Sequence, residues 1–227
     1  MPTQEYLQAE RAQSWREELR KTIKNKERID FVRVKMPEVD AEIRSRTYDE
    51  VNLGLTFEQA RGEAQRCLDC VNPTCITGCP VEINIPKFIK NIERGEVLEA
   101  AKTLKETSAL PAVCGRVCPQ EKQCESQCFY TLKLKKEPVA IGHLERFAAD
   151  FERESGNISI PEIAPANGIK IAVVGSGPAG LAFAGDMIKL GYDVTVFEAL
   201  HELGGVLRYG IPEFRLPNDI VDVEIDV

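Results

Sequence analysis

The sequence predicts an α + α/β protein, in which a helical, loop-rich part is followed by the first β-α-β unit of a parallel sheet. All eight cysteines lie within the 62 residues 67–128, and the last 99 residues contain none. After residue 168 the hydrophobic pattern changes, because short apolar runs there alternate with a helical segment. We therefore expect a helical arm at 1–45, a cysteine-rich helical domain at 46–155, a linker at 156–168 and an α/β part at 169–227.

The composition is that of a globular protein. Hydrophobic residues make up 43% of the 227 residues and charged residues 29%, with a formal net charge of −7. The negative charge argues against binding to nucleic acid or to an anionic membrane. No apolar run is long enough to span a membrane, and the N-terminus has no signal-peptide pattern. We expect a cytoplasmic protein with small-molecule or protein partners, whose cysteines do not form disulfides.

Helical segments are predicted in the N-terminal half. Apolar residues at helical spacing indicate an amphipathic arm from Gln4 to about Ile29. Thr56 and Gln59 form a capping-box pattern, so a helix should begin there and end just before Cys67. Two further short helices are expected at 85–94 and 96–107, on either side of Gly95.

The cysteine spacing is close to that of a bacterial ferredoxin. The run Cys67-x2-Cys70-x4-Cys75-x3-Cys79-Pro80 differs from it by two extra residues in one gap. Short gaps with Pro and Gly let four thiolates converge on one cluster. In ferredoxins the fourth cysteine serves another cluster, so Cys79 is expected to join the second group, which comprises Cys114, Cys118, Cys124 and Cys128.

Structural zinc is the alternative. Pairs of cysteines at short spacing also suit tetrahedral sites made of four thiolates. The Cys79-Pro80 dipeptide favours iron–sulfur clusters. In the alternative reading the chain is a zinc-binding protein-interaction module and its α/β part is only structural.

A glycine-rich turn carries the second chemical signal. Gly175, Gly177, Pro178, Ala179 and Gly180 follow an apolar strand at 169–174 and precede a predicted helix at 181–190 and a strand at 193–197. This is the setting of the Rossmann dinucleotide-binding fingerprint, in which the pyrophosphate lies on the helix N-terminus. Glu198, which follows the second strand, would accept hydrogen bonds from the ribose hydroxyls.

Other polar residues are predicted to have no chemical role. His143 and His201 lack a neighbouring nucleophile pattern and are expected to be structural or exposed. Residues 130–136 are expected to form a loop with a basic, solvated edge. The acids near the C-terminus are expected to form a solvated helix face: Asp219, Asp222, Glu224 and Asp226. We expect no catalytic residue in this chain.

Together these motifs resemble the family of the small (β) subunit of NADPH-dependent glutamate synthase. The family includes the flavin subunit of ferredoxin:NADP transhydrogenases and the N-terminal part of dihydropyrimidine dehydrogenase. The resemblance covers about Arg46 to the C-terminus. It is carried by the fingerprint and by the segments 63–70, 78–80, 115–119, 140–147, 203–205 and 210–217.

The resemblance implies two [4Fe-4S] clusters. One would be held by Cys67, Cys70, Cys75 and Cys128, and the other by Cys79, Cys118, Cys124 and Glu145. Dihydropyrimidine dehydrogenases have Gln at the last position, so Glu145 favours the glutamate synthase and transhydrogenase branch over pyrimidine reduction. Cys114 would then be a packed thiol without a metal.

The resemblance also implies FAD, bound by the fingerprint residues, Glu198, Gly205 and Arg215. In the intact protein, NADPH would reduce FAD, and the clusters would pass single electrons to an acceptor such as the glutamate synthase large subunit or a ferredoxin-type partner. A homo-oligomer is compatible with this scheme. Family members continue with a nicotinamide-binding domain, whereas this chain stops at Val227. We therefore expect an N-terminal piece with an incomplete FAD site and no NADPH oxidation of its own.

Overall fold

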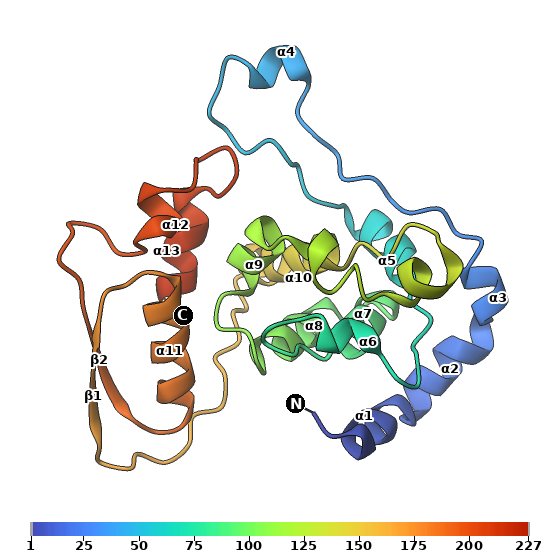
Figure 1. Ribbon diagram of the computed structural model, residues 1–227, viewed down its shortest axis with the longest axis horizontal. Coiled ribbons are helices and arrows are strands. Elements are labelled where there is room, and N and C mark those ends of the chain that lie inside the picture. Colours follow the sequence, from blue (N-terminus) through green and yellow to red (C-terminus); the bar gives the residue numbers. More distant parts are fainter. Residues whose placement is uncertain (1, 227) are drawn as a thin grey trace.

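The computed structural model describes residues 2–226, which form a helical part and a smaller α/β part lying side by side (Figure 1). The α + α/β class is confirmed. The helical part contains α1 (Gln4–Arg11), α2 (Ser14–Thr22), α3 (Asn25–Arg28), α4 (Ala41–Arg44), α5 (Phe57–Gln65), α6 (Thr74–Thr77), α7 (Ile85–Glu93), α8 (Val97–Lys105), α9 (Pro111–Val117), η1 (Gln120–Lys122), η2 (Tyr130–Leu134) and α10 (Ile141–Ser155). The α/β part contains β1 (Lys170–Val174), α11 (Pro178–Lys189), β2 (Asp193–Phe197), α12 (Val206–Tyr209) and α13 (Asn218–Asp226).

The predicted capping box begins α5. The Thr56 hydroxyl accepts from the Gln59 backbone N–H at 3.3 Å, and the Gln59 side chain accepts from the Thr56 N–H at 2.9 Å. The helix ends at Gln65, which places Cys67 just beyond it, as expected. Between α7 and α8, Gly95 has a φ of +91°, a left-handed conformation that favours glycine. These local signals confirm the predicted α5, α7 and α8.

The core of the helical part is built on α7, in which every residue except Lys87 is buried. It packs against α5, α8 and α10. Its apolar side chains join those of α8 and α10 in one core, which includes Phe88, Ile89, Ile92, Leu104 and Leu144. This core supports the loops that carry the cysteines.

The N-terminal arm, predicted to be helical and amphipathic, is not one continuous helix. It is divided into α1, α2 and α3, and its most buried side chains are those of Arg16 and Arg28. Arg28 donates to both carboxylate oxygens of Glu93, at 3.0 and 2.7 Å. The Lys90 amine donates to the same carboxylate at 2.6 Å. The arm therefore docks through buried ion pairs as well as through apolar contacts.

Residues 130–136 do not form the solvated loop that was expected. Tyr130 begins the π-helix η2, and only 1% of it is exposed. Its hydroxyl lies 2.8 Å from the Arg28 carbonyl oxygen and 2.9 Å from that of Arg66. The Arg66 guanidinium lies over the Tyr130 ring, 4.9 Å from the centroid. Tyr130 thus links the arm to the end of α5.

In the α/β part, β1 and β2 pair in parallel, in a register that runs from Lys170 opposite Asp193 to Val174 opposite Phe197. The strand positions are confirmed, and α11 begins three residues earlier than predicted because Pro178 suits its first turn. Although the run at 169–174 is apolar, most of β1 is not buried, and Val174 is 89% exposed. The helix α11 packs on the sheet, and nothing in the described part of the chain covers β1 completely.

The two parts meet where α13 packs against α9. A second apolar cluster lies there and includes Leu110, Val113, Leu216 and Val221. The sequence predicted that Glu224 of α13 lies on a solvated helix face, and this prediction is wrong. Its carboxylate accepts a hydrogen bond from the Ala112 N–H at the start of α9. No helix in the range 2–226 is both long and apolar enough to cross a membrane.

Candidate functional site

Four of the predicted ligands line one pocket: Cys67, Cys70, Cys75 and Cys128. Cys67 and Cys70 lie in the loop after α5, Cys75 lies in α6, and Cys128 lies just before η2. The Thr74 hydroxyl donates to the Gln127 carbonyl oxygen at 2.6 Å, which ties the segment of Cys75 to that of Cys128. The rest of the pocket is largely apolar, with Ile85, Ile89, Val139 and Ile141.

Burial makes these thiols hard to ionise. Burial, and after it the charges of the neighbouring Cys67 and Cys128, raise the pKa of Cys70 to about 12. The pKa of Cys75 is raised well above its usual value, first by burial and then by the other three thiols. Buried thiolates facing one another need a positively charged centre between them. The pocket therefore fits a metal cluster bound by four thiolates.

The second predicted group also comes together. A Cβ on Gly78 would lie 3.1 Å from the Cα of Cys124, so the loop of Cys79 touches that of Cys124. Glu145 of α10 faces the same group, because its charge raises the pKa of both Cys79 and Cys124, in each case after the larger effect of burial. Only 5% of Glu145 is exposed, and its Oε1 has no hydrogen-bond partner in the described structure.

Burial raises the pKa of Glu145 well above its usual value, and the charges of Cys118 and Glu224 add to this effect. A buried carboxylate oxygen without a partner is costly unless a cation or a donor satisfies it. Glu145 therefore fits the role of a ligand at a positively charged centre.

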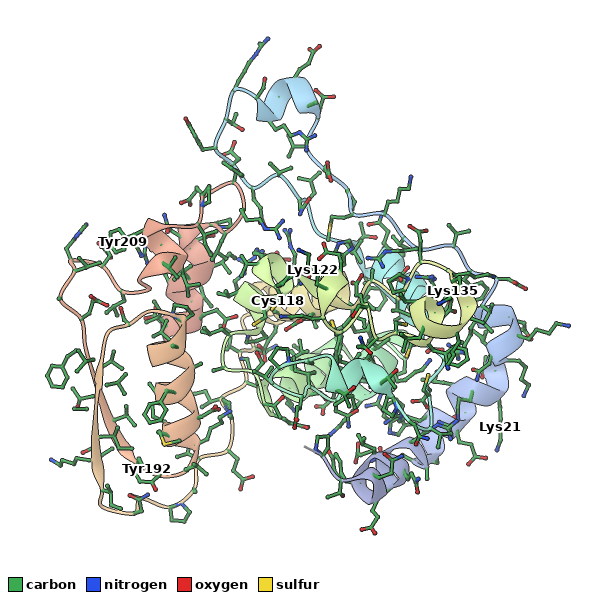
Figure 2. The ribbon with its side chains drawn as sticks, in the orientation of Figure 1. Lys21, Cys118, Lys122, Lys135, Tyr192 and Tyr209 are labelled. Carbon is green, nitrogen blue, oxygen red and sulfur yellow. The ribbon has the colours of Figure 1, made fainter. Side chains whose placement is uncertain are left out.

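Cys114 lies beside Cys118, the residue labelled in Figure 2 at the end of α9. The two thiols are one helical turn apart, and a hydrogen bond between them raises the pKa of Cys114 and lowers that of Cys118 to about 7. Sequence reasoning treated Cys114 as a packed thiol and missed this contact. The four-residue spacing on a predicted helix could have indicated it.

The first cysteine group lines a pocket. Among residues 2–226, no three or more His, Cys, Asp or Glu side chains are arranged to hold a single metal ion. All eight cysteines are free thiols.

The glycine-rich turn joins β1 to α11. Gly175 has a φ of +96°, and Gly177 is the N-cap of α11. A Cβ on Gly180 would lie 2.0 Å from the Gly175 carbonyl oxygen, so only glycine allows the helix to approach the turn this closely. Pro178 occupies the first helical position, and Ala179 next to it is exposed. The N–H groups at the start of α11 are thus available for an anion.

Glu198 supports this turn. Its carboxylate accepts from the Ser176 N–H at 2.8 Å and from the Ser176 hydroxyl at 2.5 Å, and also from the backbone N–H groups of Ala199 and Leu200. The hydrogen bond from the Ser176 side chain is the main cause that lowers the pKa of Glu198 to about 2. Ser176 is fully buried and was not singled out in the sequence, where nothing distinguished it from a variable fingerprint position.

Of the two remaining predicted flavin contacts, the structure brings one to the turn. Gly205 has a φ of +53°, and a Cβ there would lie 2.9 Å from the Gly177 Cα. The neighbouring Gly204 N–H donates to the Ser176 hydroxyl at 3.1 Å. Arg215 is exposed, and its side chain makes no hydrogen bond or ion pair with the described residues.

Two family models match the chain. Residues 44–157 match the model described as dihydropyrimidine dehydrogenase domain II, 4Fe-4S cluster. Residues 173–223 match the model of an NAD(P)-binding Rossmann-like domain. The first match covers the described cysteine groups, and the second covers the glycine-rich turn.

Similar proteins bear oxidoreductase names. The chain is 39% identical over 193 residues to the glutamate synthase [NADPH] small chain of Escherichia coli (strain K12), covering 85% of this chain and 40% of that protein. It is 42% identical over 177 residues to the NAD-dependent dihydropyrimidine dehydrogenase subunit PreT of the same organism, covering 78% of this chain and 42% of that protein.

The chain thus spans about two fifths of the length of these two relatives. Identities of 39% and 42% do not separate the glutamate synthase branch from the dihydropyrimidine dehydrogenase branch. The assignment to the glutamate synthase and transhydrogenase branch, which was based on Glu145, therefore stays a prediction. The matched domain and the relatives agree on the kind of protein. The chain belongs to the iron–sulfur oxidoreductase family that includes the glutamate synthase small chain and dihydropyrimidine dehydrogenase domain II.

Proposed function

We propose that the chain is the electron-transfer part of an NAD(P)H-dependent oxidoreductase, with two [4Fe-4S] clusters in its helical part and FAD at its glycine-rich turn. One observation carries this proposal: the helical part gathers its buried and half-buried cysteines into two groups, within a domain that matches a 4Fe-4S family. The family match supports the presence of iron–sulfur chemistry. The number of clusters and their ligands are proposed from the grouping.

In this proposal, Cys67, Cys70, Cys75 and Cys128 hold the first cluster. The pocket that these four residues line supports this assignment. Cys79, Cys118, Cys124 and Glu145 hold the second cluster, and the unpartnered Oε1 of Glu145 supports its place in this set. Cys114 remains a thiol beside Cys118.

When bound, the clusters would carry single electrons and the flavin would connect them to the two-electron chemistry of a nicotinamide. The protein's own residues bind and insulate these groups. Ile85, Ile89, Val139 and Ile141 keep water from the first site, because they supply its apolar lining. Gly177 and the first residues of α11 would bind the pyrophosphate through backbone N–H groups. Glu198, held ionised by Ser176, would accept from the ribose hydroxyls.

The proposed partner is an electron-acceptor protein, such as a glutamate synthase large subunit or a ferredoxin-type protein. The matched relatives are named as a small chain and as a subunit, which supports a protein partner. NADPH is the proposed electron donor of the whole protein. A cytoplasmic location is part of the proposal, because free cysteines suit a reducing compartment.

Metal and sulfide analysis tests the proposal against structural zinc. After anaerobic purification and reconstitution, we expect about eight iron and about eight sulfide per chain, because two four-iron clusters require that content. The protein should be brown. Stoichiometric zinc with negligible iron would show that the cysteines form an interaction module.

Pyrimidine reduction is the second candidate, and the match to the PreT subunit favours it. The two candidates differ in the protein that accepts electrons. Anaerobic electron transfer from the reduced, full-length protein to purified partners of each kind separates them. Transfer only to a dihydropyrimidine dehydrogenase partner would favour the second candidate.

A further inference from the structure

The loop that carries the first three cysteines is bound by the N-terminal arm, in contacts that the proposed function leaves unexplained. Asp69 lies between Cys67 and Cys70 and is fully buried. Its φ is +51°, in the left-handed region that non-glycine residues seldom adopt. This backbone conformation needs support from its surroundings.

Three arginines of the arm provide that support. Arg16 forms an ion pair with Oδ1 of Asp69, and Arg20 forms one with Oδ2. Arg11 donates from Nε to the Asp69 backbone carbonyl oxygen at 2.7 Å. Every oxygen of Asp69 is therefore bound by an arginine from α1 or α2.

The contacts continue along the same loop. The Gln4 side-chain amide donates to the Val71 carbonyl oxygen at 3.3 Å and to the Asn72 side chain. Within the arm, Arg20 donates to the Arg11 carbonyl oxygen at 2.9 Å, which joins α2 to the end of α1. The arm thus binds the loop both between Cys67 and Cys70 and between Cys70 and Cys75. Figure 1 shows α1, α2 and α3 along one side of the helical part.

We propose that α1 and α2 act as a clamp on the loop 67–75. The clamp holds the loop in the conformation in which its three cysteines face the first cluster, and it binds the loop mainly through Asp69. This inference rests on the proposed function. Asp69 is a positioning residue, because its carboxylate is bound by arginines of the arm and acts on the cysteines through the backbone. Losing either partner of a buried pair leaves the other charge unpaired. Replacing Asp69 or replacing its arginine partner should therefore weaken the same contact between the arm and the loop.

The test is the rate at which iron leaves the full chain. The reconstituted protein is exposed anaerobically to a ferrous chelator, and iron release is followed together with the electron paramagnetic resonance spectrum of the reduced clusters. The variants are Asp69→Asn, Arg16→Met and the double variant. Glu17→Gln is the matched control, because Glu17 lies on α2 beside Arg16 but is half exposed and pairs with Lys21.

We expect Asp69→Asn to release about half of the iron at least ~10-fold faster than the unaltered chain, a change of about 1.4 kcal/mol. The other half should leave at the original rate, because the second cluster lies outside the clamp. Glu17→Gln should behave as the unaltered chain. The double variant should release iron no faster than Asp69→Asn, because residues that form one pair are not additive.

Release at the original rate from Asp69→Asn, or equal acceleration for both halves of the iron, would overturn the clamp while leaving the proposed function intact. If Asp69→Asn fails to fold, Arg20→Met replaces it, because the Arg20 side chain is 17% exposed and the Arg16 pair remains. Arg20→Met should accelerate the release of iron from the first cluster only. An unaltered chain that binds no iron at all would overturn the proposed function and the clamp together.

Discussion

Gly115 of α9 lies against the backbone of Arg146 in α10, so closely that a Cβ on the glycine would be 2.5 Å from the Arg146 nitrogen. Cys118 follows at the end of α9, and Glu145 immediately precedes Arg146 in α10. The crossing is also held by Arg116, which lies 2.9 Å from both carboxylate oxygens of Asp150. The close approach at Gly115 therefore sets how far Cys118 lies from Glu145.

Gly115→Ala should destabilise the protein, because α9 must move away from α10 to admit the methyl group. Overpacking of this kind costs about 1–3 kcal/mol. Gly62→Ala is the control: Gly62 lies within α5 with nothing near its missing Cβ, and the change should stabilise by about 0.5–1 kcal/mol. The thermal unfolding midpoints of the two purified variants should move in opposite directions. A midpoint for Gly115→Ala equal to that of the unaltered chain would contradict the tight crossing.

Cys114→Ser should leave the iron content unchanged, whereas Cys118→Ser should lose one cluster. The physical reason is that only Cys118 belongs to the proposed ligand set, although the two thiols are in contact. Iron and sulfide analysis after anaerobic reconstitution measures the difference. Equal iron loss from both variants would show that the ligand assignment is wrong.

Glu145→Gln should retain iron and change the electron paramagnetic resonance spectrum of one cluster, whereas Glu145→Ala should lose that cluster. The amide keeps an oxygen ligand but removes a negative charge from a buried site, and the methyl group provides no ligand. Glu121→Gln is the control, since Glu121 is exposed. Unchanged spectra for both Glu145 variants would remove Glu145 from the ligand set.

The stability of the chain should depend on pH through Glu224. Burial raises the pKa of this carboxyl from 4.5 to about 7, so the folded chain binds a proton between these pH values that the unfolded chain does not bind. The contribution to stability is therefore full below pH 4.5 and falls as the pH rises to 7, by about 3 kcal/mol in all.

Glu224→Gln should remove this dependence, because the amide cannot ionise. The unfolding midpoints of the two chains should agree near pH 4.5, and the unaltered chain should unfold at the lower temperature near pH 7.5. His143, whose pKa is lowered to about 4 mainly by burial, is present in both chains. The difference between their unfolding midpoints therefore reports the ionisation of Glu224 and not that of His143. A midpoint difference that does not change with pH would contradict the prediction.

Ser176→Ala should weaken FAD binding to the full-length protein about tenfold, or about 1.4 kcal/mol, because its hydroxyl joins Glu198 to the Gly204 backbone. Thr195→Ala is the control, because it also removes a hydroxyl, at an exposed position of β2 outside the fingerprint, and it should bind FAD normally. Flavin fluorescence titration measures both. Equal affinities would mean that the turn keeps its shape without the serine.

Much of the fold could be predicted because its signals are local. Thr56 and Gln59 are three residues apart, and the pattern of residues 193–197 marks a strand by itself. Asp69 and Glu224 could not be interpreted in this way. Their partners, Arg16 and Ala112, lie 53 and 112 residues away in the sequence, so nothing near either acid indicated that it is buried.

The candidate site shows the same division. The spacing of Cys67, Cys70 and Cys75 indicated a shared centre, because short gaps leave the thiols few other arrangements. Placing Cys128 with them depended on the family resemblance, and the structure shows Cys128 in the same pocket. The contact between Cys114 and Cys118 could have been predicted from their four-residue spacing on a helix. The hydrogen bond between Ser176 and Glu198 could not have been predicted in this way, because it forms only when β1 and β2 pair.

The ion pair between Arg28 and Glu93 also limits how the protein can be divided. The family model begins at residue 44, which separates the arm from the cysteine-rich domain. Expression of residues 44–157 alone would remove Arg28 and leave the buried Glu93 carboxylate with Lys90 as the one cationic partner that the structure shows within that range. A boundary drawn from sequence similarity is thus a poor choice for making a minimal electron carrier. A shortened protein meant to fold should begin at or before Gln4.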